Sequence, residues 1–349
     1  MSPRNRILPV FIPHLGCPYH CVFCNQNAIT GQDYSATAEM VNIELEQVGC
    51  RRYEACDSAP FEVAFYGGSF TAIPKEVQET LLSIVQPYRA TGWVRSIRCS
   101  TRPDAISPDI LQLLGRYGVE TIELGCQSMD DDVLIKSGRG HKAEDVVRAS
   151  RLIRDEGFHL ILQMMTGLPG SDPDKDLQTA RELIELDPDG VRIYPTVIIR
   201  NTPLFNMWKK GEYEEHKVED AVCICSRIVP MFLESGIPVI RLGLNPSDDL
   251  SGGTAAGGAY HPSFGELVYS RIMRNRAEQI LQSRKMSGLV ELHVSPSFVS
   301  KMTGNRKSNL DYLSRIFPDM EFRVIPDDSV PDWDVAIPLQ KDWKNSIIY

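Results

Sequence analysis

The feature that most constrains this chain is a repeated alternation of two kinds of segment between residue 7 and about residue 243. Short runs rich in β-branched residues alternate with amphipathic segments of helix length. Each short run is followed by a loop rich in Gly, Pro, Ser or Cys. This βαβα order builds a parallel sheet or barrel. The predicted strands are Ile7–Ile12, Phe61–Tyr66, Ser96–Ser100, Thr121–Leu124, His159–Met164, Gly190–Tyr194 and Val239–Leu242.

Helices are predicted between these strands because apolar residues recur there at helical spacing. In parallel α/β architectures, ligands bind at the carboxyl ends of the strands, so the loops after the strands should carry the chemistry. The predicted helices are Lys75–Tyr88, Pro108–Tyr117, Ala143–Glu156, Lys175–Leu186 and Glu219–Ser235.

Length and composition set the class of protein. With 349 residues and 42% hydrophobic residues, the chain can bury a sizeable core. No run of 18 or more apolar residues occurs, and the apolar stretch that ends at Pro13 is typical of an opening strand rather than a signal peptide. We therefore expect a cytoplasmic protein without a membrane partner. The net charge of −9, taken alone, argues against nucleic acid.

Three cysteines crowd into the loop after the first predicted strand. Cys17, Cys21 and Cys24 have the spacing Cys-x3-Cys-x2-Cys. Thiolates are the usual ligands of iron–sulfur clusters, and a [4Fe-4S] cluster normally takes four of them. Three thiolates leave one iron open to the amino and carboxylate groups of S-adenosylmethionine (SAM). Electron transfer from such a cluster cleaves SAM to a 5′-deoxyadenosyl radical.

Two other interpretations of the cysteines stay open. A zinc site needs a fourth ligand, which His14 or His20 would supply. Alternatively, the three cysteines are inert and buried. The position of the loop after the first strand of an α/β domain favours the cluster.

The segment CPYHCVFC resembles the signature of the radical SAM superfamily. The resemblance implies a partial (β/α)6-type TIM-like barrel that binds a [4Fe-4S] cluster and SAM. It places Phe23 near the adenine of SAM. It also implies that Gly67, Gly68 and Ser69, in GGSF after the second strand, receive the amino group of the methionine moiety. Ser69 replaces the acidic residue of the family at this turn.

A finer resemblance is to the radical SAM half of the Elongator catalytic subunit and its bacterial relatives. It implies that Gln127 and Arg139 face the ribose and carboxylate of SAM, and that Thr166, Gly167 and Leu168 lie along the adenine. This chain spaces its cysteines more closely than that group and has no acetyltransferase pattern. The resemblance therefore supports SAM cleavage but not carboxymethylation. It is carried by GGSFTAIP, STRPDAI, ELGCQS, SGRGH, MTGLPG and RIYPTVIIRNTPLFNMWKKGEY.

Further polar side chains are candidates for catalysis. Tyr260 and His261 follow a Gly-rich stretch that either covers the barrel mouth, where they would serve as acid, base or substrate contacts, or is only a linker. Cys126 lies at a strand end and either donates a hydrogen atom or is a buried apolar residue. Cys99, also near a strand end, is a candidate of the same kind as Cys126. The weaker candidates are Arg200 and Asn245.

The chain divides on composition into a radical SAM barrel at 1–243, a Gly-rich loop and connecting helix at 244–287, and a small basic α+β module at 288–349. The module contains the order strand, helix, helix, strand and resembles a KH domain core, in which a GxxG loop clamps the nucleic-acid backbone. In this chain a lysine replaces the second glycine. The candidate RNA contacts are Lys301, Gly304, Arg306 and Lys307.

Charge is unevenly distributed along the chain. Residues 266–318 carry nine basic and four acidic side chains, a local charge of +5, which leaves −14 on the rest. The acidic balance therefore argues against nucleic acid for the barrel but not for the module.

These observations predict a radical SAM enzyme directed at RNA, with tRNA modification as the expected activity. An electron donor such as flavodoxin or ferredoxin is implied. Two alternatives remain: the same chemistry on a small metabolite or peptide, or a zinc-stabilised binding protein without catalysis.

Overall fold

The computed structural model describes residues 6–12, 16–17, 21–25, 37–54, 59–244 and 250–338. The chain forms two compact units. The first comprises Met1–Ala221 and Met231–Pro262, and the second comprises Val222–Pro230 and Ser263–Tyr349. The Gly-rich stretch thus belongs to the first unit, whereas the helix after it belongs to the second.

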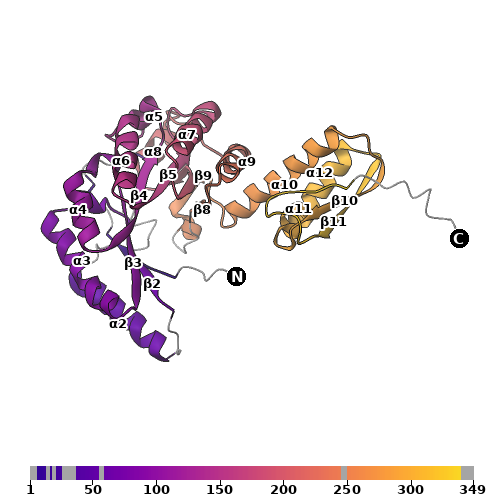
Figure 1. Cartoon of the computed structure of the whole chain (residues 1–349). Coiled ribbons are helices and arrows are strands. Elements are labelled where there is room, and N and C mark those ends of the chain that lie inside the picture. The colour runs from indigo at the N-terminus through magenta and orange to yellow at the C-terminus, as the bar shows by residue number, and fades with distance from the viewer. Residues whose placement is uncertain are drawn as a thin grey trace. The chain divides into compact units, whose positions relative to one another are not determined.

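A curled sheet of parallel strands forms the first unit (Figure 1). Its seven strands follow the order β1-β2-β3-β4-β5-β6-β8, so that consecutive strands are neighbours. All seven predicted strands are present, and the prediction of a parallel α/β sheet curled into a partial barrel is confirmed. The strands are β1 (Ile7–Phe11), β2 (Phe61–Tyr66), β3 (Val94–Thr101), β4 (Val119–Gln127), β5 (His159–Thr166), β6 (Gly190–Pro195) and β8 (Val239–Leu242).

Helices connect these strands and lie outside the curled sheet in Figure 1. In α4, Ser107 caps the first turn by accepting a hydrogen bond from the Ile110 amide, and Pro108 occupies the first helical position. Leu111 and Leu114 of this helix are buried, as expected for an amphipathic helix over a sheet. The helices of this unit are α2 (Ala38–Glu54), α3 (Lys75–Ala90), α4 (Pro108–Arg116), α5 (Asp131–Lys136), α6 (Ala143–Asp155), α7 (Pro173–Glu185), α8 (Pro203–Lys209) and the ends of α9 (Val218–Glu234).

Four features of the first unit, three helices and one small sheet, were not predicted. Helices α5 and α8 are too short to show a helical period, and α2 mixes its apolar and charged residues. The fourth is a two-stranded antiparallel sheet of β7 (Val197–Ile199) and β9 (Ala255–Gly258). Since β9 has the sequence Ala-Ala-Gly-Gly, which disfavours strands, only its pairing with β7 defines it.

The second unit has the predicted order strand, helix, helix, strand. Its strands β10 and β11 pair in parallel, and Ala336 adds one antiparallel bridge to His293. The elements are α10 (Phe264–Gln282), β10 (Gly288–Val294), α11 (Val299–Thr303), α12 (Ser308–Ile316) and β11 (Met320–Pro326).

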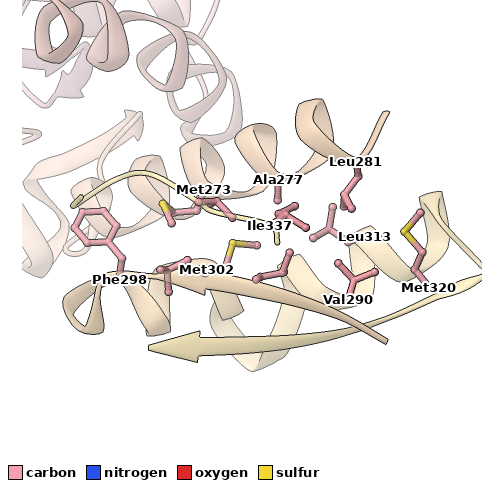
Figure 2. Close-up of a cluster of buried hydrophobic side chains, with 12 residues drawn as sticks. Met273, Ala277, Leu281, Val290, Phe298, Met302, Leu313, Met320 and Ile337 are labelled. Carbon is pink, nitrogen blue, oxygen red and sulfur yellow. The ribbon is translucent and has the colours of Figure 1, made fainter. Parts of the chain in front are cut away.

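A separate hydrophobic core holds this unit together (Figure 2). Met273, Ala277 and Leu281 of α10 point toward Val290 of β10 and Leu313 of α12. The connecting helix is therefore part of the core of the second unit. Among the described residues, no helix is long and apolar enough to cross a membrane.

Candidate active site

The cysteine loop begins directly after β1. Cys17, Cys21 and Cys24 are all free thiols. Residues 13–15 and 18–20, with the alternative zinc ligands His14 and His20, lie outside the described residues. Within the described part of the chain, no three His, Cys, Asp or Glu side chains are grouped so as to hold one metal ion. A four-iron cluster has a separate iron for each thiolate, so its cysteines need not converge on one point.

The first cysteine of the loop packs against the GGSF turn. Gly16 has φ of 74°, and a Cβ atom there would collide with the carbonyl oxygen of Ser69 and with Ile73. The Cys17 Sγ atom lies 3.5 Å from the Ser69 Oγ atom. Only glycine fits at position 16 without shifting the thiol or the turn.

The turn itself is fixed from the far side. The side-chain amide of Gln78 donates to the carbonyls of Thr71 at 3.3 Å and Ile73 at 2.8 Å. The hydroxyls of Thr71 and Thr101 lie 2.6 Å apart. Gly67, with φ of 100°, supplies the backbone turn after β2. The GGSF segment is therefore a rigid surface against which the cysteine loop is set.

Arg139 links the cysteine loop to the end of β4. Its Nη1 atom donates to the Cys21 Sγ atom at 3.2 Å, and its Nη2 atom donates to the Gly125 carbonyl. The buried Nε atom of Arg139 has no partner among the described residues. Gln127, with φ of 67°, places its side-chain amide beside Gly125. The structure thus brings together Cys21, Gln127 and Arg139, which are 118 residues apart at the extremes.

Phe23 belongs to a small apolar cluster on the other side of the loop. It packs against the buried side chains of Ile198 of β7, Leu204 of α8 and Tyr213. The backbone of Val22 fixes this position, because its carbonyl accepts from the Leu204 amide at 2.8 Å and its amide donates to the Ser137 carbonyl at 3.0 Å.

Thr166 is the last residue of β5, and Gly167 and Leu168 begin the loop that follows. Gly167 has φ of 70°, and the ring of His216 lies where a Cβ atom would be. The Thr166 hydroxyl lies 3.2 Å from the His216 Nε2 atom. The Tyr213 hydroxyl donates to the Gly167 carbonyl at 2.7 Å. The two side chains that contact this loop, Tyr213 and His216, were not singled out from the sequence.

Asp176 of α7 also holds the loop after β5 through hydrogen bonds. Its carboxylate accepts from the Gly167 amide at 3.0 Å and from the Ser171 hydroxyl at 2.6 Å. The side chain is buried, and burial raises the pKa of Asp176 to about 6 despite these hydrogen bonds. The sequence contains a sign of this role, because Asp176 lies among the buried apolar positions of α7, with Leu177, Ala180 and Leu183.

The inner face of the sheet carries a charged network that the sequence analysis missed. Glu123 of β4 is fully buried and accepts from Tyr66 at 3.1 Å, Arg98 at 3.0 Å, Arg192 at 2.8 Å and Gln163 at 2.9 Å. Arg98 also pairs with Glu62 at 2.6 Å. These side chains come from β2, β3, β4, β5 and β6 and alternate with outward apolar residues.

The cysteine candidates for hydrogen-atom donation lie elsewhere. Cys126 alternates along β4 with Glu123 and Gly125, which places its thiol on the face opposite to the charged network. It is fully buried, and burial raises the pKa of its thiol to about 12. Cys99 is also fully buried, and burial raises the pKa of its thiol as well.

The Gly-rich stretch contains β9, which pairs with β7 just beyond the carboxyl end of β6. The Ala259 amide donates to the Thr196 carbonyl at 3.1 Å, and Tyr260 and His261 are the next two residues. Arg200 donates from its Nε atom to the Gly253 carbonyl at 2.8 Å and lies over the Phe205 ring. Asn245 lies outside the described residues.

The candidate RNA contacts lie in the second unit. Lys301 bonds to the Ser297 carbonyl at 3.2 Å and lies 4.7 Å from the centre of the Phe298 ring. Arg306 and Lys307 are exposed and have φ of 50° and 65°. Gly304 has φ of 77°, and a Cβ atom there would meet Ser308 and Asn309. The turn between α11 and α12 thus presents two cations at its surface.

Comparison with known families identifies the class of protein. The sequence model of the radical SAM superfamily matches residues 11–183, and that of the radical SAM C-terminal domain matches residues 188–274. The chain belongs to the radical SAM superfamily and is an enzyme of that superfamily.

The relatives narrow this class further. The chain is 33% identical over 172 residues to the tRNA uridine(34) acetyltransferase of Methanocaldococcus jannaschii, covering 48% of this chain and 31% of that protein. It is 27% identical over 271 residues to human Elongator complex protein 3, covering 72% and 47%. It thus spans less than half the length of each of these two curated relatives.

A solved structure supports the same fold. The archaeal Elp3 of Methanocaldococcus infernus superimposes with a TM-score of 0.61 at 23% identity, covering 78% of this chain and 63% of that one. This structure shows the shared fold, and the two curated relatives confirm the resemblance to the Elongator group seen in the sequence.

The close fit at Gly16 predicts a large effect of one methyl group. Gly16→Ala forces the cysteine loop away from Ser69 and Ile73, so we expect most iron and sulfide to be lost after anaerobic reconstitution. Gly92→Ala is the matched control, because it has φ of 76° but no atom within 4 Å of the new Cβ. The measurement is the iron and sulfide content per chain, with circular dichroism to confirm folding. Full iron content in Gly16→Ala would contradict the predicted constraint.

The buried carboxyl of Asp176 predicts a pH-dependent stability. The folded chain keeps its proton up to about pH 6, whereas the unfolded chain releases it near 3.8. Stability from this group is therefore highest below about pH 4 and falls as the pH rises to about 6, by about 3 kcal/mol. Asp176→Asn removes this fall, measured as the free energy of unfolding in urea from pH 4 to 7. Asp174→Asn, at an exposed position on the same helix, should keep it. Parallel pH profiles for wild type and Asp176→Asn would contradict the prediction.

Proposed function

We propose that this chain is a radical SAM enzyme that modifies RNA, with tRNA as the substrate class. The observation that carries the radical SAM part is the contact between Arg139 and Cys21, because the same side chain has a buried Nε donor without a partner. A buried donor of this kind favours an acceptor brought by a ligand. The carboxylate of SAM supplies such an acceptor at the cysteine loop.

In this proposal Cys17, Cys21 and Cys24 hold a [4Fe-4S] cluster. When bound, the cluster supplies the electron that cleaves SAM to a 5′-deoxyadenosyl radical. The three free thiols and their separate positions along one loop fit this group. A low-potential electron donor such as flavodoxin or ferredoxin completes the requirement.

The residues around the loop hold SAM by different means. Gly67, Gly68 and Ser69 offer backbone groups to its amino group, in a turn that Gln78 keeps rigid. Arg139 and Gln127 orient its carboxylate and ribose.

Along the adenine, Phe23 supplies an apolar ring, and the loop from Thr166 to Leu168 supplies a backbone edge. Asp176, Tyr213 and His216 fix that edge by contacting Gly167 directly. They are positioning residues for the loop.

The RNA part of the proposal rests on two independent observations. The curated relatives include a tRNA uridine(34) acetyltransferase. Residues 266–318, all within the second unit, carry a local charge of +5, and Arg306 and Lys307 are exposed at the turn after Gly304. Exposed cations at a turn suit a phosphate backbone, and they give affinity without reading sequence.

The radical SAM part is tested by reductive SAM cleavage. After anaerobic reconstitution with iron and sulfide, the chain should release 5′-deoxyadenosine from SAM in the presence of dithionite. Cys24→Ala should abolish this release, because it removes one cluster ligand. Cys223→Ala changes an exposed cysteine on α9 and should leave it unchanged. Tetrahedral zinc in place of iron, with no SAM cleavage, would establish the zinc-stabilised alternative instead.

The RNA part is tested by binding as a function of salt. Full-length protein carrying its cluster should bind tRNA more weakly as salt rises. The double variant Arg306→Ala with Lys307→Ala should make the negative slope of log K against log salt shallower by roughly 1 to 2. Arg151→Ala with Arg181→Ala, two exposed changes in the barrel unit, serves as the matched control. Absence of salt-sensitive tRNA binding by the wild type contradicts an RNA substrate and favours a small metabolite or peptide.

A further inference from the structure

The inner face of the barrel sheet carries a pair of neighbouring guanidinium groups. In the pairing of β6 with β8, Arg192 lies opposite Arg241. Tyr194 is two residues further along β6 and so shares their face. Like charges directly opposite each other on two strands repel, and such a pair is unfavourable without a compensating group. Arg192 and Arg241 differ in the groups that offset their charges.

Arg192 has partners within the sheet. Its Nη2 atom donates to Glu123 at 2.8 Å and to the Tyr66 hydroxyl at 3.0 Å, and its guanidinium lies 5.5 Å from the centre of the Tyr66 ring. Its buried Nε atom nevertheless has no partner among the described residues. Arg192 therefore keeps one donor for a further acceptor.

Arg241 has no acidic partner in the described part of the chain. Its Nε atom donates a hydrogen bond to the Gly243 carbonyl at 3.1 Å. Burial lowers the pKa of Arg241, and the charge of Arg192 acts in the same direction, whereas Tyr194 opposes them. These surroundings are those of a half-buried cation whose counter-charge comes from elsewhere.

The acids of the inner face are already committed. Glu123 accepts from four side chains, and Glu62 accepts from Arg98 and from Ser96 at 3.2 Å. Three arginines, Arg98, Arg192 and Arg241, thus face two carboxylates. The described inner face carries one positive charge in excess.

We propose that Arg192 and Arg241, beside Tyr194, bind an oxyanion group of the substrate, either a carboxylate or a phosphate. The proposal rests on the proposed radical SAM function and names the chemistry of the group held in the barrel. Paired guanidinium groups recognise the planar oxygens of a carboxylate or two oxygens of a phosphate. The bound anion neutralises the excess charge and accepts from the Nε atom of Arg192.

This subsite is separate from the proposed SAM site. The proposed SAM site uses the loops after β1, β2, β4 and β5, whereas Arg192 and Arg241 are side chains of β6 and β8 themselves. The donor assigned to the carboxylate of SAM is Arg139, after β4. The anion held by Arg241 therefore belongs to the second substrate.

The test is anion binding by the full chain carrying its cluster, with SAM saturating and no reductant present. Acetate and inorganic phosphate are titrated separately and followed by calorimetry. Arg241→Gln should weaken binding of the preferred anion roughly tenfold to hundredfold, the loss expected for a charge-assisted hydrogen bond. Arg241→Lys keeps the charge without the planar fork and should give an intermediate loss. Arg151→Gln, an exposed change on α6, should bind as the wild type does.

The two probes separate the two sources of the anion. Tighter binding of phosphate assigns the subsite to a nucleotide phosphate, and tighter binding of acetate assigns it to a carboxylate-bearing substrate. The proposal is overturned if the wild type shows no saturable binding of either anion, or if both Arg241 variants bind as the wild type does. Because the titration needs neither RNA nor turnover, such a failure is distinct from a failure of SAM cleavage or of tRNA binding measured on the same preparations.

Discussion

The buried carboxylate of Glu123 is the interaction on which the barrel depends. A charge removed from water is tolerated only when donors surround it, and Glu123 meets donors from β2, β3, β5 and β6. One side chain thus ties five strands together on their inner face. The outer face can then be mainly apolar and packed beneath helices, while the inner face stays polar. Removing a single donor would leave a buried charge partly unpaired, which costs more than the hydrogen bond itself contributes.

The candidate active site follows from how backbone and side chains meet at the carboxyl end of this sheet. Gly16 lets the cysteine loop approach the GGSF turn, and Arg139 joins that loop to the end of β4. Gly167 allows the ring of His216 to lie flat on the backbone after β5. Each contact joins segments that are far apart in sequence. The loops are therefore positioned by contacts between them as much as by the strands that precede them.

The sequence predicted best what local patterns determine. The seven sheet strands are β-branched runs between turn residues, so their order and parallel arrangement were readable, and the cysteine spacing indicated the superfamily. The features that the sequence did not predict depend on contacts between residues that are distant in the chain. Asp176 and His216 matter through their contacts with the loop after β5, and the network of Glu123 exists only after distant strands align. The strand β9 has an unfavourable composition and is defined by pairing with β7. Short helices such as α5 offer too few residues for a period.

The sheet ends in two edges, because β1 and β8 stand at opposite ends of the strand order and do not pair with each other among the described strands. A closed barrel of strands admits a substrate only through its two mouths, so anything larger than the mouth must present a free end. An open sheet has a lateral opening along its length. A single unit within a polymer can be admitted sideways while the polymer continues in both directions outside. The missing closure thus makes the fold geometrically compatible with a reacting group that stays attached to a macromolecule.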